Sequence, residues 1–210
     1  MIRFRLASIH DVQRLAEIHY MCREDLHNSF MCALGRNFLR AYYRIVLSSP
    51  DAVVLNAVND DNIVTGFTVC SLDARAQFAF IEQHKFALFR SMFFSLILQP
   101  KLLPGVLLRR NMMRGKNDSS AFIVFEGARN EFLAIDPHYR NGPHAMILMK
   151  RTLDLARTLG VVDLWIEVDK DNPRATRFHE MLGAKHVRTT TLPSGIIRQI
   201  MCYTLKNQGQ

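Results

Sequence analysis

Apolar and polar positions alternate in runs that predict an ordered series of strands and helices. Residues 2–6 predict a short strand, after which Val12, Leu15 and Ile18 recur at the spacing of one helix face. A second helix is predicted over residues 35–47, where large apolar side chains again fall on one side. The chain therefore begins with a strand and two amphipathic helices.

Two strands are predicted next, over residues 52–58 and 63–72, and the Asn-Asp-Asp-Asn sequence between them is a strong turn signal. We therefore expect a β-hairpin. Residues 121–126 and 131–135 are also strand-like, and the four residues between them favour a bulge or a turn.

The last third of the chain predicts a helix, a strand, a helix and two strands. The first helix is expected over residues 143–159, with a proline in its first turn and a glycine after its end. An apolar strand follows over residues 162–168, and Asn172 opens a short helix. The final strands are predicted over residues 184–190 and 199–205.

This order predicts a single α/β domain over residues 1–210, built on one mixed, mostly antiparallel sheet with helices on both faces. The strand–helix–strand unit within residues 131–168 is expected to be a right-handed parallel crossover. Residues 74–120 separate two predicted strands and are basic and apolar, so we expect a helical insert there.

Composition limits the class of protein. With 49% apolar residues among 210, the chain can bury a core. No run of 18 apolar residues occurs and the first residues do not resemble a signal peptide, so a cytoplasmic protein is expected. The four cysteines are scattered, which favours reduced and buried thiols, and no metal-ligand spacing appears, so we expect no metal.

The positive charge is concentrated in one segment. Residues 83–117 contain seven basic residues and no acidic residue, which leaves 27 − 7 = 20 basic residues against 19 acidic ones elsewhere. Within this segment, Arg90, Ser91 and Ser95 are expected to face water. Four roles are open for the insert: helices with apolar faces in the core, a lid over an anionic acceptor, peripheral membrane contact, and a homodimer interface. No nucleic-acid partner is expected, because no motif that reads nucleic acid is present.

A tight loop with Arg140 and Gly142 joins a predicted strand to the helix that begins at residue 143. The first amides of a helix lack internal partners, and with the helix dipole they can bind a phosphate or pyrophosphate. Arg140 can add a charge-assisted contact. Because many strand–loop–helix turns contain glycine and bind nothing, a purely structural loop is the alternative.

The sequence from Asp136 to Arg140 (Asp-Pro-His-Tyr-Arg), followed by small residues and a helix, resembles motif A of the GNAT N-acetyltransferase superfamily. A second block, in which Asn172, Ala175 and Gly183 keep the spacing, resembles the family's Asn-x-x-Ala…Tyr-x-x-x-Gly-Phe signature. The blocks occur in the family's order, and the resemblance covers most of the chain. It implies the GNAT fold and the use of acetyl-CoA.

The resemblance also implies where acetyl-CoA binds. Its pyrophosphate is expected on the loop and the first helix amides, and its pantetheine arm on the preceding strand, which must be opened for that purpose. The residues expected to contact it are Leu133, Ala134, Ile135, Arg140, Asn141, Gly142, His144, Ala145, Met146, Asn172 and Phe178.

Two positions depart from the family pattern. Pro143 stands where the family has a loop glycine, and a proline lacks the N–H that could donate to phosphate. His179 stands where many members have a tyrosine near the departing thiolate. A histidine with a pKa of roughly 6.5 could donate that proton. The alternative is a helix-surface residue without a role.

The resemblance implies acetyl transfer to an amine, which requires a base for the amine proton. Glu131 is the first candidate, and Glu126 is another. The alternative for Glu131 is a structural ion pair with Arg129. We expect an N-acetyltransferase that acts on a primary amine of a small molecule, such as an amino sugar or another anionic acceptor. The competing hypothesis is a catalytically silent, CoA-binding or membrane-peripheral module.

Overall fold

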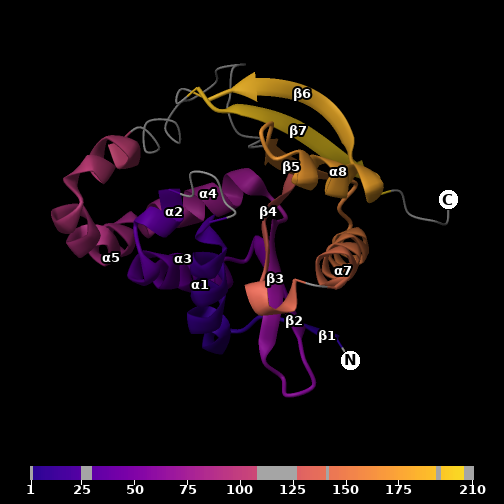
Figure 1. Ribbon diagram of the computed structural model, residues 1–210, viewed down its shortest axis with the longest axis horizontal. Coiled ribbons are helices and arrows are strands. Elements are labelled where there is room, and N and C mark those ends of the chain that lie inside the picture. Colours follow the sequence, from indigo (N-terminus) through magenta and orange to yellow (C-terminus); the bar gives the residue numbers. More distant parts are fainter. Residues whose placement is uncertain (1, 25–29, 108–126, 141, 193–194, 206–210) are drawn as a thin grey trace.

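A central sheet with strand order β1-β2-β3-β4-β5-β7-β6 organises the computed structural model, which describes residues 2–24, 30–107, 127–140, 142–192 and 195–205 (Figure 1). All neighbouring strands are antiparallel except β4 and β5, which run parallel. The predicted fold class and the parallel strand–helix–strand unit are therefore confirmed. The strands are β1 (Arg3–Leu6), β2 (Ala52–Val58), β3 (Val64–Ser71), β4 (Ala128–Ile135), β5 (Asp163–Asp169), β6 (Lys185–Thr191) and β7 (Ile197–Thr204).

Helices cover both faces of this sheet. On one face, α1 and α3 pack onto β2 and β3 through residues such as Leu15, Leu39 and Phe67. On the other face, α7 and α8 enclose a cluster that includes Met149 and Leu164. The helices are α1 (Val12–Met21), α2 (Phe30–Ala33), α3 (Arg36–Ser48), α4 (Ala74–Gln83), α5 (Lys85–Leu98), α7 (His144–Thr158) and α8 (Pro173–Met181), with short 3-10 turns at Ile9–Asp11, Cys22–Glu24, Pro100–Leu102 and Pro137–Tyr139.

Local signals in the sequence explain most of these boundaries. The β2–β3 hairpin turns at Asn59, whose Oδ1 accepts a hydrogen bond from the amide of Ile63 at 2.8 Å, and at Asn62, which has a positive φ of 62°. Gly160, with φ of 83°, follows the end of α7 as predicted. The short helix α2 was not predicted, since four residues carry no helical period.

One predicted break is wrong. We expected residues 127–130 to interrupt two strand-like runs, yet β4 begins at Ala128 and continues to Ile135. Only Gly127, with φ of 74°, adopts a turn conformation. The irregularity in pairing falls instead at Glu131, because Asn130 and Phe132 pair with consecutive residues of β3. The strand predicted over residues 121–126 lies outside the described residues.

The insert packs into the core only in part. Helices α4 and α5 do lie between β3 and β4 in the chain, but of the residues of α5 only Met92 is buried. This helix is apolar on every side, so one neighbouring helix cannot bury it all. Ser95, expected to face water, donates instead to the carbonyl oxygen of Leu34 at 2.8 Å. The large apolar side chains on the opposite side remain exposed.

Burial of the thiols agrees with the prediction. Cys22, Cys32, Cys70 and Cys202 are all buried, and none of them forms a disulfide. Within the part of the chain that the structure describes, no helix combines the length and the apolar character that crossing a membrane requires.

Candidate functional site

Strands β4 and β5 pair only at one end and then separate. Ala128 lies opposite Leu164 and Arg129 opposite Trp165, and no further pair of described residues continues this ladder. β5 pairs with β7 along its whole length, and β4 pairs with β3. The edge of β4 that faces β5 is therefore open beyond Arg129, where backbone groups can take another partner.

A bulge in β4 explains the opening. Val69 of β3 pairs with Phe132 and Cys70 pairs with Asn130, so Glu131 is the extra residue. A bulge bends its strand and increases the local twist. As a result, β4 turns away from β5 after two pairs, and Glu131 lies at the closed end of the opening.

The residues of the open edge are held firmly from behind. Ala134 and Ile135 are buried, so their side chains are fixed within the sheet. β3 approaches this end closely, because a Cβ on Gly66 would lie 2.9 Å from the carbonyl oxygen of Ala134 and would collide with the Ile135 side chain. Leu133 packs against the cluster beneath α7 and α8. The three residues expected to pair with pantetheine thus lie on a rigid, open edge.

The chain leads from this edge to the first turn of α7. Pro143 is the N-cap residue and no side chain caps this end. The amide of Ile147 donates to the carbonyl oxygen of Pro143 at 2.9 Å, and the preceding amides of His144, Ala145 and Met146 have no intrahelical acceptor. The Nδ1 atom of His144 is buried and has no hydrogen-bond partner among the described residues. This end therefore offers three amides and one ring nitrogen to an anionic group.

The sequence suggested that Pro143, which lacks an N–H, would remove a phosphate donor from the loop. Its position in the structure answers part of that concern. As the N-cap residue it precedes the three free amides, so its missing N–H is not one of them. Gly142 has no positive φ, but a Cβ at this position would lie 2.9 Å from Nδ1 of His144. The glycine thus keeps space beside the orphaned ring nitrogen.

The Arg140 side chain points back toward β4. Its Nε donates to the carbonyl oxygen of Ile135 at 3.2 Å, and its Nη2 lies 3.1 Å from Sγ of Cys22. These contacts tie the loop to the end of β4 and to the residue that follows α1. Contact between Arg140 and a phosphate stays a prediction, and Asn141 lies outside the described residues, as does Glu126.

Glu131 belongs to a chain of ion pairs that crosses three strands. Arg129 pairs with Glu131 at 3.2 Å and with Glu167 of β5 at 3.3 Å. Arg198 of β7 pairs with Glu167 at 2.9 Å and with Asp169 at 2.7 Å. The ion pair between Glu131 and Arg129, which the sequence left open as an alternative, is therefore present.

Burial changes the pKa of Glu131 and of a tyrosine near it. Desolvation raises the pKa of the Glu131 carboxyl, against the opposing influence of Arg129, and the nearby charge of Glu167 raises it further. A carboxylate with a raised pKa is a stronger base. Tyr42 of α3 lies near it, since burial and then the charge of Glu131 raise the pKa of its phenol.

On the opposite face of the sheet, His179 of α8 contacts Tyr203 of β7. Its Nδ1 atom lies 2.7 Å from the Tyr203 hydroxyl oxygen. Burial lowers the pKa of His179 to about 4 and raises that of Tyr203. The expectation that charged and neutral His179 coexist near neutrality is therefore wrong, because burial penalises the imidazolium. His179 is not a free surface residue either.

Sheet pairing places the His179–Tyr203 contact near the closed end of the opening. Ala128, Leu164 and Tyr203 are successive partners across β4, β5 and β7, and all three belong to the cluster beneath α7 and α8. The structure therefore brings Glu131 and His179 to the two faces of the sheet at the same end of the opening.

Two residues expected to contact acetyl-CoA have structural contacts in α8. Asn172 is its N-cap, and its Oδ1 accepts a hydrogen bond from the amide of Ala175 at 3.0 Å. Phe178 packs into the cluster beneath α8, with its ring edge-on to His179 at 5.0 Å. Their contact with acetyl-CoA stays a prediction.

Sequence reasoning missed Tyr203, Glu167 and Arg198. A signal for Glu167 existed, because polar and apolar residues alternate along β5 and place it on the face opposite Leu164. Nothing in the sequence joined Tyr203 to His179, since their contact depends on how α8 packs on β7. Within the described ranges, no group of three or more His, Cys, Asp or Glu side chains could hold a metal ion.

These features fit acetyl-CoA. The open edge of β4 can pair with the amides of the pantetheine arm, as an added strand would. The free amides of α7 and the unpartnered Nδ1 of His144 suit the pyrophosphate at the other end of that arm. Both lie on the same strand–loop–helix unit.

Comparisons with known proteins agree with this geometry. The acetyltransferase (GNAT) family model matches residues 118–184 of the chain. No curated protein matches the sequence.

Solved structures share the fold. The ribosomal-protein-S18-alanine N-acetyltransferase from Escherichia coli superposes with a TM-score of 0.57 at 13% identity, covering 100% of this chain and 97% of that one. A spermidine/spermine N-acetyltransferase from Vibrio cholerae gives 0.57 at 12% identity, over 98% and 95%. NAA60 from Arabidopsis thaliana, in complex with acetyl-CoA, gives 0.58 at 16% identity, over 99% and 100%. At these identities, the likeness shows the fold.

Proposed function

We propose that this chain, of which residues 118–184 match the GNAT acetyltransferase family model, is an enzyme of that kind and transfers an acetyl group from acetyl-CoA to a primary amine of a small molecule. One observation carries the proposal. The opened edge of β4 ends at a buried carboxylate on one face of the sheet and at a neutral His–Tyr pair on the other. Acetyl-CoA supplies the thioester carbonyl that the amine attacks.

Glu131 takes the role of base in this proposal. An amine is protonated at neutral pH and must lose a proton before it can attack. The carboxylate is largely buried and pairs with Arg129 at 3.2 Å, and burial raises its pKa, which makes it more basic. The ion pair with Arg129 is compatible with this role, because a carboxylate has a second oxygen to offer.

His179 and Tyr203 take the role of proton donor on the opposite face. The high pKa of Tyr203 keeps its phenol protonated, so its hydroxyl can donate to Nδ1 of the neutral imidazole. The imidazole proton then resides on Nε2. We propose that Nε2 gives its proton to the sulfur as the C–S bond breaks while Tyr203 passes its proton to Nδ1, and that water then returns one proton to the pair.

The acceptor is proposed to be a small anionic molecule, such as an amino sugar derivative. Support comes from the excess of basic residues in 83–117, because a positively charged segment attracts anionic molecules. The single domain and the cytoplasmic location remain predictions from the sequence, and a homodimer interface remains one of the roles left open for the insert.

Titration calorimetry with acetyl-CoA and a thiol-release assay with a panel of amines test the proposal. We expect heat of binding, and thiol release with at least one anionic amine. Glu131→Gln should keep acetyl-CoA binding and lower kcat by about 100-fold, the usual contribution of a general base. Glu180→Gln, at an exposed position of α8, is the matched control and should retain full turnover.

The outcomes separate the two hypotheses. Absence of heat with millimolar acetyl-CoA would rule out the proposed acetyltransferase function. Heat without thiol release from any amine would favour the silent CoA-binding module. Unchanged kcat in Glu131→Gln would leave the reaction intact but assign the base to another residue.

A further inference from the structure

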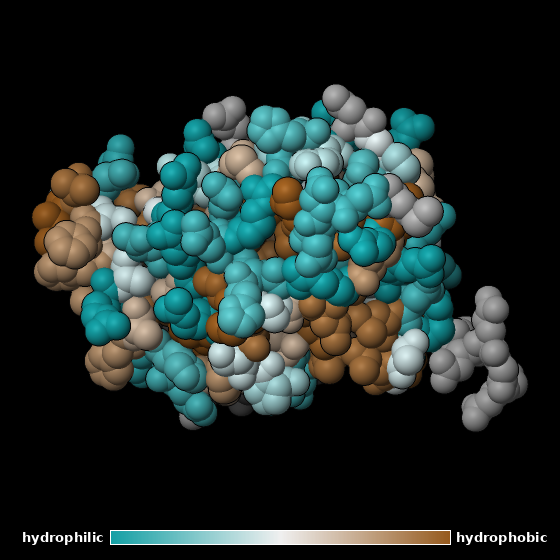
Figure 2. Space-filling view, turned by 90° about the horizontal axis from the view of Figure 1, so that it is seen from below, coloured by the Kyte–Doolittle hydropathy of each residue, from teal (hydrophilic) through white to brown (hydrophobic). Residues whose placement is uncertain are grey.

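Helix α5 leaves most of its apolar surface in solvent. Phe86, Phe94 and Leu98 are 79%, 73% and 80% exposed, Phe89 is 51% exposed, and Met92 is the buried residue of the helix. Figure 2 shows hydrophobic side chains gathered at the end of the molecule where Figure 1 places α5. A helix that is apolar all round is normally buried in a core or a membrane. This face therefore lacks the partner that its composition requires.

Arg90 is a basic residue in the middle of this apolar face. At 3.6 residues per turn, Phe86, Phe93, Ile97, Arg90 and Phe94 fall within an arc of roughly 100°. Arg90 lies near the centre of that arc and is exposed. Aromatic rings around a guanidinium are suited to a surface that is apolar inside and anionic at its boundary.

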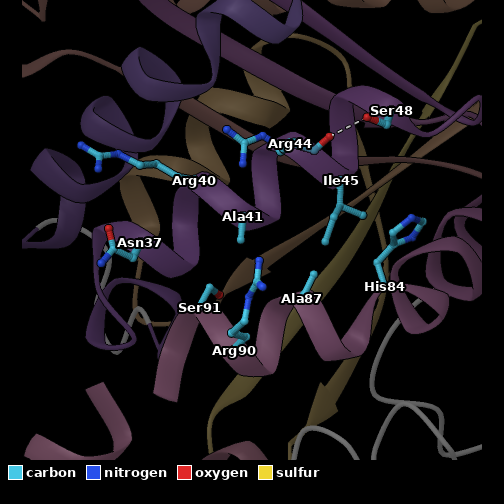
Figure 3. Close-up of a pocket in the computed structure, with 10 residues that line it drawn as sticks. All are labelled: Asn37, Arg40, Ala41, Arg44, Ile45, Ser48, His84, Ala87, Arg90 and Ser91. Carbon is cyan, nitrogen blue, oxygen red and sulfur yellow. Dashed lines mark hydrogen bonds between the residues drawn. The ribbon is translucent and has the colours of Figure 1, made fainter. Parts of the chain in front are cut away.

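An arginine-lined groove adjoins this face. It has a volume of about 560 Å³ and lies between α3 and α5 (Figure 3). Arg40 and Arg44 line it from α3, and Arg90 reaches into it from α5 toward Ala41. No acidic side chain lines the groove, and within the described residues none of these three arginines forms an ion pair. The groove is therefore a concentrated, uncompensated positive charge.

Two other occupants fit less well. In a two-fold dimer through this face, Arg90 of each copy would meet like charges, since such an interface joins the same patch on both subunits. A soluble anion would use the groove but would leave the phenylalanines of α5 exposed. A phospholipid surface uses both, because its phosphates face the arginines and its acyl boundary accepts the rings.

We propose that the exposed face of α5, with the groove between α3 and α5, docks this protein onto an anionic phospholipid surface. None of these residues belongs to the site between β4 and β5, so docking can be tested separately from the transfer reaction, although Arg90 is also one of the basic residues in 83–117 that would attract an anionic acceptor. We call these residues the α5 docking face, with Phe86, Phe94, Arg40, Arg44 and Arg90 as its central members.

Sedimentation with vesicles tests the docking face. The full chain should bind vesicles of phosphatidylcholine with phosphatidylglycerol, bind far less to phosphatidylcholine alone, and dissociate at high salt. Each basic residue near an anionic surface contributes about five-fold to partitioning, so Arg40→Gln/Arg44→Gln/Arg90→Gln should lower it by about 100-fold. Phe86→Ser/Phe94→Ser should weaken binding at every salt concentration.

A charge-matched variant on β6 and the loop before α8 provides the control. Lys170→Gln/Lys185→Gln/Arg188→Gln removes three exposed cations and should retain vesicle binding. Circular dichroism checks that each variant is folded, which is expected because all substituted side chains are exposed.

Three results would overturn the proposal. One is equal binding to both vesicle types or to neither. Another is a dimer, by light scattering, that dissociates in Phe86→Ser/Phe94→Ser, which would assign the face to a second copy. The third is calorimetric binding of glycerol phosphate that depends on the three arginines, without vesicle binding, which would leave only a soluble-anion site.

Discussion

Protonation of His179 should couple the stability of this fold to pH. Burial lowers its pKa in the folded state to about 4, whereas the unfolded chain has the ordinary value of roughly 6.5. The unfolded chain therefore binds the proton more tightly. The contribution of the neutral ring to stability is complete above pH 6.5 or so and is lost as the pH falls toward 4.

The size of the effect follows from the shift. One pKa unit corresponds to about 1.36 kcal/mol, and pH 5 lies roughly 1.5 units below the unfolded value, which gives about 2 kcal/mol. The ring of His179 is partly exposed, so we expect between about 1 and 2 kcal/mol after screening. His19, whose pKa burial lowers to about 3, adds to the acid sensitivity of the wild type and of any His179 variant alike.

Urea unfolding at pH 7 and pH 5 measures the difference. His179→Gln keeps an amide that can accept from the Tyr203 hydroxyl but does not titrate, so it should lose about 1–2 kcal/mol less than the wild type on acidification. His186→Gln, at an exposed position of β6, should follow the wild type. Parallel losses in wild type and His179→Gln would show that burial does not lower the pKa of the imidazole.

Three further substitutions test the framework of the site. Gly66→Ala should destabilise the fold by about 1–3 kcal/mol in thermal or urea unfolding, because its Cβ would lie 2.9 Å from the carbonyl oxygen of Ala134; an unchanged Tm would contradict the close approach of β3 to β4. Tyr203→Phe should lower kcat while leaving acetyl-CoA affinity unchanged, and a loss of affinity alone would remove Tyr203 from proton transfer. Asn172→Ala should cost about 1 kcal/mol of stability, since it deletes the cap of α8, and an unaltered urea midpoint would show that the cap contributes nothing.

The sequence predicted the elements well because local signals mark their ends. The turn at Asn59, the glycine after α7 and the Asn172 cap all act within a few residues of the boundary they set. The order of elements and their patterning also led to the correct sheet type. What local patterns could not reveal was the register of β4 on β3, which decides that Glu131 is the extra residue of the bulge.

The sequence predicted the parts of the site that are contiguous in the chain, but not the contacts between separate strands and helices. The loop before α7 follows from contiguous residues, and there the amides of α7 lie as expected. The ion-pair chain through Arg129, Glu167 and Arg198, and the contact between His179 and Tyr203, join different strands and helices. Such contacts depend on how the elements pack, so composition and spacing carry no signal for them. The same limit explains why the environment of His179, and hence its pKa, was mistaken.

Helix α3 connects the two halves of the proposed function. Its inner side packs on the sheet, with Tyr42 close enough to Glu131 for the charge of that carboxylate to raise the tyrosine pKa. Its outer side carries Arg40 and Arg44, which are among the residues that line the groove of the docking face. A membrane surface that binds Arg40 and Arg44 would therefore restrain α3, the helix beside Glu131, although it touches no residue of the site. If docking serves the transfer, anionic vesicles should change the KM for an amine acceptor in the wild type and not in Arg40→Gln/Arg44→Gln/Arg90→Gln, while the KM for acetyl-CoA stays constant in both. Equal KM values with and without vesicles would show that docking does not affect catalysis and serves only to locate the protein at the membrane.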